Sequence, residues 1–148
     1  MKKEELSRLR KLQMEIKSQY EVLTETKQQA YRITQLITGL PKGHNGDGLS
    51  GAVIKVMAMA EMIEESMKSS IEEYTQKYEQ AAKEIKQIPN TQERAILELR
   101  YLAFKSWYEI AKLMHLSERQ VYRMHKGTVE KYFSKDVSKC QSMSVNVS

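Results

Sequence analysis

Three helix-start patterns lie close together in the last third of the sequence. Asn90, Ser106 and Ser117 are each followed, three residues later, by Glu or Gln. This is the spacing of a capping box, in which the side-chain oxygen of the first residue accepts hydrogen bonds from the free N–H groups of a first helical turn. An apolar-periodic run follows each pattern, so the sequence predicts three short helices between residues 91 and 133.

The connection between the second and third of these helices is short. The second helix is expected over about 107–114 and the third over about 118–133, with a tight turn at His115 and Leu116 between them. Apolar residues occupy the positions where two such helices bury side chains: Ile110, Ala111, Met114, Leu116, Val121 and Met124. This arrangement predicts a helix-turn-helix, a motif that presents its second helix to the major groove of DNA.

The third helix has two different faces when residues are placed at 100° intervals. One face is expected to point inward: Val121, Met124, Thr128 and Tyr132. The opposite face carries Arg119, Arg123, Lys126 and Glu130, with Gln120 and Tyr122 beside it. Arginine can donate two hydrogen bonds to guanine O6 and N7, and glutamine can pair with adenine. A lysine one turn further along suits a phosphate.

The candidate DNA-binding residues are therefore Glu118, Arg119, Gln120, Tyr122, Arg123 and Lys126. An ordinary solvated helix face is the competing interpretation, and charge alone would favour it. Glu118 has two open roles, because it either accepts a hydrogen bond from cytosine N4 or only stabilises the helix N-terminus. The indole of Trp107 is expected to pack in the core rather than to reach the DNA backbone. Arg94 and Arg100 either reach phosphates or pair with glutamates of their own helix.

Two long amphipathic helices are expected before this region. Apolar side chains recur at steps of three and four from Lys3 to Thr38, and again from Val53 to about Lys86. A single polar helix of that length needs a partner. The two helices are expected to form an antiparallel, coiled-coil-like hairpin, or to pair with a second chain.

The expected fold class is all-α. Residues 1–88 are predicted to form the long helical hairpin with a Gly-rich loop at 39–51, and residues 89–133 the helix-turn-helix domain. The tail 134–148 is rich in serine and lacks periodicity, so we expect it to be disordered. In the loop, Lys42 precedes Gly43, which is the wrong order for a phosphate-binding P-loop.

The charge distribution favours an anionic partner for the last helices. The formal net charge is +5. Residues 89–133 hold eight Lys or Arg and five Asp or Glu, giving +3, whereas residues 52–88 hold five and seven, giving −2. A basic domain of this kind suits nucleic acid, although many soluble proteins are equally basic.

Several other classes of protein are not expected. The single Cys140 cannot form an internal disulfide, and no Cys/His spacing indicates a metal site. The three histidines are scattered and no catalytic set emerges, so we expect neither an enzyme nor a cofactor. No run approaches the roughly 20 apolar residues of a membrane span. Cytoplasmic localisation without a membrane partner is the expectation.

Three segments resemble a known family. LELRY at 97–101, SWYEIAKLM at 106–114 and LSERQVYRM at 116–124 look like region 4 of bacterial sigma factors, which contacts the −35 promoter element. The whole chain is similar to phage-encoded transcription regulators of the RinA and ArpU type. This resemblance implies that Glu118, Arg119, Gln120, Tyr122 and Arg123 contact bases. Two positions differ, because Phe104 and His115 stand where the family often has glycine. Phe104 suggests a repacked first loop.

The resemblance implies a sequence-specific DNA-binding regulator of phage or prophage late genes. Its expected partners are double-stranded DNA, RNA polymerase, and a second copy of the chain bound through the N-terminal helices. Two alternatives stay open. One is a small terminase-like DNA-packaging protein, which would assemble into a ring. The other is a module that binds RNA polymerase or a sigma factor and has no DNA site of its own.

Overall fold

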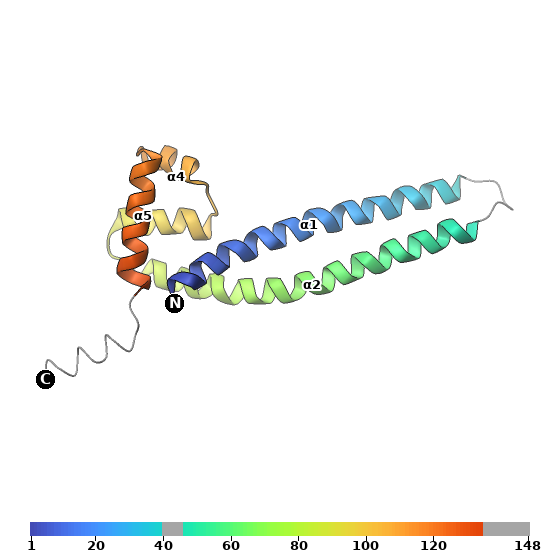
Figure 1. The fold of residues 1–148 in the computed structure, drawn as a ribbon, viewed down its shortest axis with the longest axis horizontal. Helices are drawn as coiled ribbons and strands as arrows, with labels where there is room; N and C mark the ends of the chain where they lie inside the picture. Colours follow the sequence, from blue (N-terminus) through green and yellow to red (C-terminus); the bar gives the residue numbers. More distant parts are fainter. Residues whose placement is uncertain (40–45, 135–148) are drawn as a thin grey trace, which may run out of the picture. The chain divides into compact units, whose positions relative to one another are not determined.

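The protein is helical throughout the part of the chain that can be described. The computed structural model describes residues 1–39 and 46–134, apart from the side chains of 46–49. The helices are α1 (Lys3–Thr38), α2 (Gly46–Lys86), α3 (Thr91–Leu97), the π-helical turn η1 (Glu98–Leu102), α4 (Trp107–Met114) and α5 (Glu118–Phe133) (Figure 1). No strand occurs within these described ranges. The predicted all-α fold, a long helix pair followed by shorter helices, is confirmed.

The chain divides into two compact units. The hairpin unit comprises Leu12–Glu73, and the terminal unit comprises Met1–Lys11 together with the chain from Tyr74 onward. The terminal unit therefore joins the first turns of α1 and the last turns of α2 to the helices that follow Pro89. None of the described helices combines the length and the apolar character that crossing a bilayer would require.

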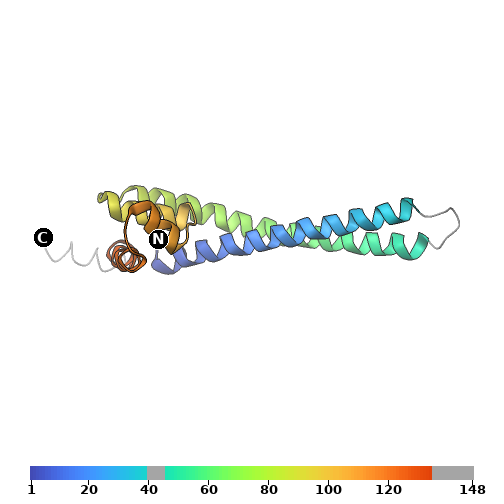
Figure 2. The ribbon, with the colours of Figure 1, turned by 90° about the horizontal axis from the view of Figure 1, so that it is seen from above.

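In the hairpin unit, α1 and α2 lie side by side and run in opposite directions (Figures 1 and 2). Leu23, Ala60 and Met67 are buried between them, with Ile16 and Ile63 packed against this cluster. Polar contacts also link the two helices. Lys27 Nζ lies 2.7 Å from Glu64 Oε1, and Gln19 Nε2 donates to Ser66 Oγ at 3.1 Å. The apolar stripes predicted from the sequence thus close within one chain.

The start of α2 differs from the expected loop at 39–51. Residues 46–51 are already helical, and Gly39 lies in a turn just after α1. Each glycine weakens a helix by about 1 kcal/mol relative to alanine, which is why a longer loop was expected. The long helix that follows outweighs this cost, because adding residues to an existing helix is much easier than starting one. Residues 40–45 of the expected loop, and tail residues 135–148, lie outside the described residues.

The larger core cluster of the terminal unit joins the start of α1 to α2, α3, η1 and α5. Leu6 and Leu9 of α1 are fully buried. They share one cluster with residues of α2, α3, η1 and α5 and of the α2–α3 connection: Ala81, Ile85, Ile88, Leu97, Tyr101, Val129 and Phe133. Val129 and Phe133 were not part of the inward face predicted for α5. They are buried because they belong to the same cluster as Leu6 and Leu9 of α1.

Candidate nucleic-acid interface

Helix α4 is capped at its start and ends in a tight turn. Ser106 caps α4, since its Oγ accepts from Glu109 N at 3.2 Å while Glu109 Oε2 accepts from Ser106 N at 2.8 Å. His115 ends α4 in the left-handed conformation, with φ 56° and ψ 41°. Leu116 N then donates to Ala111 O at 3.0 Å. Hydrogen bonds of this kind satisfy carbonyls that a helix end leaves free. The predicted cap and the predicted turn are both confirmed.

The start of α5 is fixed in the same way. Ser117 Oγ accepts from Gln120 N at 3.1 Å, and Gln120 Oε1 accepts from Ser117 N at 3.0 Å. The predicted capping box is therefore complete on both sides. One consequence concerns Gln120 itself: its carbonyl oxygen is engaged by the cap, which limits the freedom of this amide to turn toward a base.

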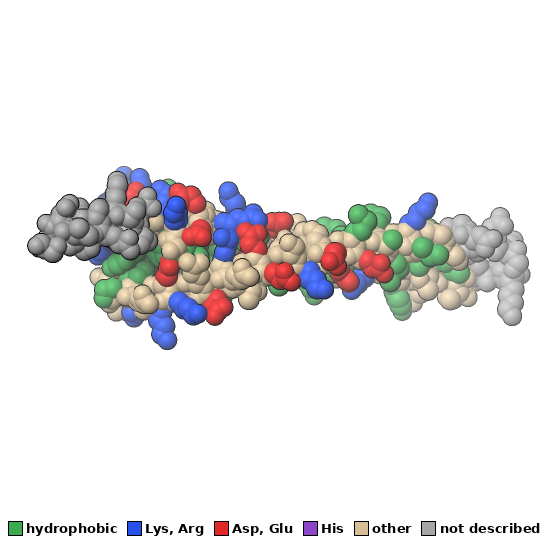
Figure 3. All heavy atoms as spheres, turned by 90° about the horizontal axis from the view of Figure 1, so that it is seen from below, with side chains coloured by type: hydrophobic (Ala, Val, Ile, Leu, Met, Phe, Trp, Pro, Cys, Tyr) green, Lys and Arg blue, Asp and Glu red, His purple; other side chains and the backbone are tan. Residues whose placement is uncertain are grey.

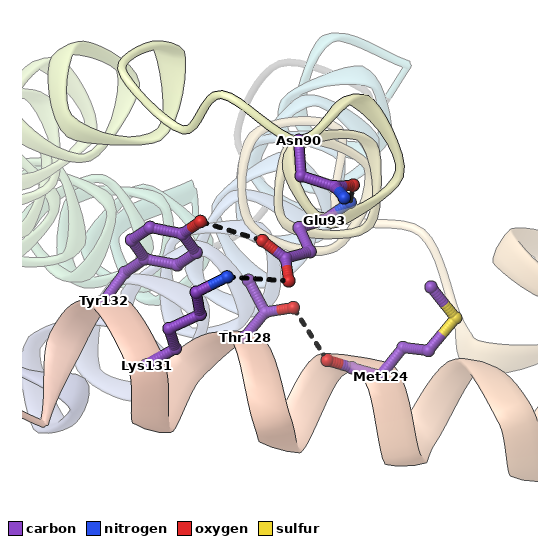
Figure 4. Close-up of polar contacts among 6 residues, drawn as sticks. All are labelled: Asn90, Glu93, Met124, Thr128, Lys131 and Tyr132. Atoms are coloured by element: carbon purple, nitrogen blue, oxygen red, sulfur yellow. Dashed lines mark hydrogen bonds and ion pairs between the residues drawn. The ribbon is translucent and has the colours of Figure 1, made fainter.

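The third predicted capping box is only half formed. Asn90 Oδ1 accepts from Glu93 N at 3.0 Å, but the Glu93 carboxylate does not return to Asn90. It accepts from Tyr132 Oη at 2.9 Å and lies 3.4 Å from Lys131 Nζ (Figure 4). The sequence prediction was wrong on this point because two donors from α5 compete for the carboxylate. Their contacts join the end of α5 to the start of α3.

The inner side of α5 packs on α4. Ile110, Ala111 and Val121 are buried together, and Leu99, Trp107, Met114 and Leu116 pack against them. Thr128 is also buried, with its hydroxyl donating to Met124 O at 2.8 Å. Since α5 is held from this side, its rotation about its own axis is fixed. The residues on the other side therefore have a defined direction.

All six predicted DNA-binding residues lie on the exposed side of the terminal unit. Glu118, Arg119, Gln120, Tyr122, Arg123 and Lys126 are each exposed. Tyr122 retains 56% of its surface although it is aromatic. These side chains thus belong to one solvent-accessible face, which we call the α5 face. The α5 face combines three cations, one carboxylate, one amide and one phenol.

A cluster of aromatic rings and one cation, which the sequence did not indicate, packs behind the α5 face. Its members are Arg100, Trp107, Tyr122 and His125. The guanidinium carbon of Arg100 lies 3.8 Å from the Trp107 ring centre. Trp107 meets Tyr122 and His125 edge-on, with ring centres 5.5 Å and 4.7 Å away. Such contacts each contribute about 0.5–1.5 kcal/mol. Trp107 therefore packs as expected, and its neighbour Tyr122 connects the cluster to the α5 face.

The two arginines of uncertain role are both engaged within the unit. Arg94 Nη1 donates to Ile88 O at 3.0 Å, and its Nε lies 3.7 Å from Glu98 Oε1. Arg100 Nη1 donates to Lys105 O at 3.2 Å while its plane covers Trp107. Arg94 thus pairs with Glu98, one of the two expected roles, whereas Arg100 contacts Lys105 and Trp107, which neither expected role included.

His125 is the titratable group most changed by this environment. Burial, reinforced by the charges of Arg100 and Arg10, lowers the pKa of His125 to about 4. Its Nε2 lies 2.7 Å from the hydroxyl of Tyr101, whose own pKa is raised by burial. The ring is neutral near pH 7, and its tautomer decides which of the two groups donates in this hydrogen bond.

The first loop of the terminal unit also departs from ordinary backbone geometry. Phe104 has φ 56°, a conformation that side chains other than glycine adopt infrequently. Its ring centre lies 6.0 Å from that of Tyr74 on α2. Through this aromatic contact the side chain of Phe104 joins the loop to α2.

The described residues contain no cluster of three His, Cys, Asp or Glu side chains that could hold a metal ion. A family model described as a protein of unknown function (DUF1492) matches residues 42–132, and the chain belongs to that family. No curated protein and no solved structure matches the chain.

Proposed function

We propose that this member of the DUF1492 family is a sequence-specific DNA-binding transcription regulator of phage or prophage late genes. The observation that carries the proposal is the α5 face: a capped, rotationally fixed helix whose exposed side chains are of types that can contact bases. A turn closed by His115 presents this helix, as in other helix-turn-helix proteins. The link to late genes rests on the resemblance to phage regulators alone.

Five of the six side chains of the α5 face have an assigned role in this proposal. Arg119 and Arg123 donate to guanine, Gln120 pairs with adenine through its amide nitrogen, and Lys126 binds a phosphate. The +3 charge of residues 89–133 attracts DNA at long range, and this attraction weakens as salt is added. Tyr122 contributes an apolar edge for a thymine methyl group or a hydroxyl for a phosphate.

The decisive experiment is selection of bound sequences from random duplex DNA by the full-length chain at a stated salt concentration. A sharp motif of a few base pairs is the expected result, because four side chains of the α5 face can contact bases. Enrichment of no motif, with equal affinity for all duplexes, would refute sequence-specific recognition. It would instead favour a module that docks on RNA polymerase or a sigma factor.

The hairpin unit supports a second part of the proposal, that two copies of the chain associate. Lys55 and Glu61 interrupt an otherwise apolar run of Ala, Val, Ile and Met from 52 to 63. Ile54 and Met62 on the outer side of α2 retain 69% and 72% of their surface. Figure 3 shows apolar side chains gathered over this end of the hairpin. A helix that is apolar on all sides is normally covered on all sides.

A second hairpin is the partner that fits best, because it brings an equally long apolar surface and forms a four-helix bundle with the first. An operator read by two α5 helices would then contain two related half-sites. A higher ring, as in a small terminase-like packaging protein, would give a different mass in solution. RNA polymerase is the further partner that activation of transcription would require.

A further inference from the structure

A cavity of about 210 Å³ lies within the terminal unit, beside the α5 face. The first turns of α1 contribute Lys3 and Ser7 to its wall, and α5 contributes Tyr122, His125 and Lys126. Two of these residues, Tyr122 and Lys126, also belong to the α5 face. The cavity is therefore continuous with the surface proposed to meet DNA, and it extends that surface onto α1.

The side of α1 that borders the cavity is firmly positioned. Lys3 and Ser7 are four residues apart, so they lie on one side of the helix. On the adjoining side, Leu6 and Leu9 are fully buried in one cluster with Val129 and Phe133. Anchored through these contacts, the exposed side chains of Lys3 and Ser7 stay next to the C-terminal half of α5.

The chemistry of the cavity suits an anion with several acceptor oxygens. Lys3 and Lys126 bring two exposed cations from different helices, and Ser7 and Tyr122 bring hydroxyl donors. Glu130 also lines the cavity and reduces its positive potential, so one phosphate is a better match than several. The first turn of α1 carries Glu4 and Glu5, which means that side chains rather than the helix end supply the attraction.

We propose that this cavity binds a phosphate of the DNA backbone at the edge of the major groove, and that α1 is thereby part of the DNA-binding surface. The inference rests on the proposed function, and it adds Lys3 and Ser7 to the contacts. Half or more of the hydrogen bonds between proteins and DNA go to phosphate and sugar oxygens. Lysine, serine and tyrosine are among the side chains that donate them. A phosphate held between two helices would also fix the angle at which α5 enters the groove.

The test compares Lys3→Ala with Lys11→Ala in the full-length chain. Lys11 is an exposed lysine of the same helix and does not line the cavity, so it is a matched control. Affinity is measured at a series of salt concentrations on the selected duplex and on random DNA. Lys3→Ala should weaken both complexes and make the slope of log K against log salt less steep by about 0.9. Lys11→Ala should leave the slope unchanged.

A second measurement locates the phosphate. Duplexes carrying one uncharged methylphosphonate linkage at successive positions are bound to wild type and to Lys3→Ala. One position should weaken the wild type but have no effect on Lys3→Ala, because the variant has already lost that contact. If every position affects both proteins alike, or if the salt slope of Lys3→Ala equals that of wild type, the inference is wrong. Thermal melts show whether the variants remain folded.

The outcomes separate this inference from the proposed function. A sharp selected motif with no effect of Lys3→Ala removes the phosphate site and leaves sequence recognition intact. A Lys3-dependent salt slope without any motif supports the phosphate site and removes sequence-specific recognition. Absence of all binding to DNA, under conditions where the chain is folded, overturns both.

Discussion

The hydroxyl of Tyr101 lies 2.7 Å from Nε2 of His125, and this contact ties η1 to the middle of α5. Their rings lie 5.6 Å apart, and His125 also meets Trp107. The contacts of His125 thus hold α5 in place within one turn of the exposed Tyr122 and Lys126. Burial and the charges of Arg100 and Arg10 disfavour the protonated form of this ring, which makes the packing around it sensitive to acid.

Acid should destabilise the protein through His125. The pKa of His125 is about 4 in the folded protein and about 6.5 in an unfolded chain. Between these values the unfolded chain binds a proton and the folded one does not, so the free energy of unfolding falls as pH falls. The loss from pH 6.5 to pH 5 should be about 1–2 kcal/mol, reduced from the full shift because solvent screens a half-buried ring. Urea titrations at each pH measure it.

His125→Gln is the informative variant, because it retains an amide for Tyr101 and does not titrate. Its stability should change less than that of wild type between pH 6.5 and 5. The lowered pKa values of Glu5 and Glu109 lose their stabilising effect only below about pH 4.5, outside this window. His115→Asn is the control, since asparagine tolerates the left-handed backbone at that position. An unchanged pH dependence in His125→Gln would show that His125 is not responsible.

Arg123→Ala should reduce discrimination between DNA sequences. If Arg123 forms two hydrogen bonds with guanine, its loss should cost about 1–3 kcal/mol on the selected duplex and much less on random DNA. Fluorescence anisotropy at fixed salt measures both affinities. Lys126→Ala serves as the comparison, because a phosphate contact should weaken both duplexes alike. Equal losses for Arg123→Ala on the two duplexes would contradict its assigned role.

Ser117→Ala should destabilise α5 from its start. The substitution removes the acceptor for Gln120 N and breaks the capping box, which typically costs about 1 kcal/mol. Chemical denaturation measures the loss of stability. Ser117→Thr keeps a hydroxyl in place and should retain most of it. If Ala and Thr prove equally stable, the hydrogen bond contributes nothing to folding.

Met62→Glu should weaken association between chains. Met62 keeps 72% of its surface in the single chain, so a charge there harms the monomer little but would be buried in a four-helix interface. Light scattering should show a wild-type dimer that dissociates more readily in the variant. Glu65→Gln, a nearby exposed position, should leave the mass unchanged. A wild-type chain that stays monomeric at high concentration would remove this part of the proposal.

Local patterns explain why much of the fold was predictable. The caps at Ser106 and Ser117 act within three residues, so their sequence spacing determines their contacts. The two long apolar stripes likewise follow directly from helical periodicity. The exposure of Arg123 and Lys126 follows from the burial of Val121 on the opposite side of the same helix.

Contacts between distant residues could not be predicted in this way. The carboxylate of Glu93 binds Tyr132, thirty-nine residues later, instead of its own helix start. Leu6 and Leu9 were indistinguishable by pattern from other leucines of a long stripe, yet they pack on α5. The cavity beside Lys3 depends on that packing, so no sequence motif marks it.

The burial of Leu6 and Leu9 against Val129 and Phe133 has a consequence for synthesis. A ribosome releases the two leucines more than a hundred residues before Val129 and Phe133 emerge, so this core stays incomplete until α5 has been made. The hairpin can form meanwhile, as its contacts need nothing beyond Glu73. A nascent chain halted before α5 would therefore lack the part of this core that Val129 and Phe133 contribute.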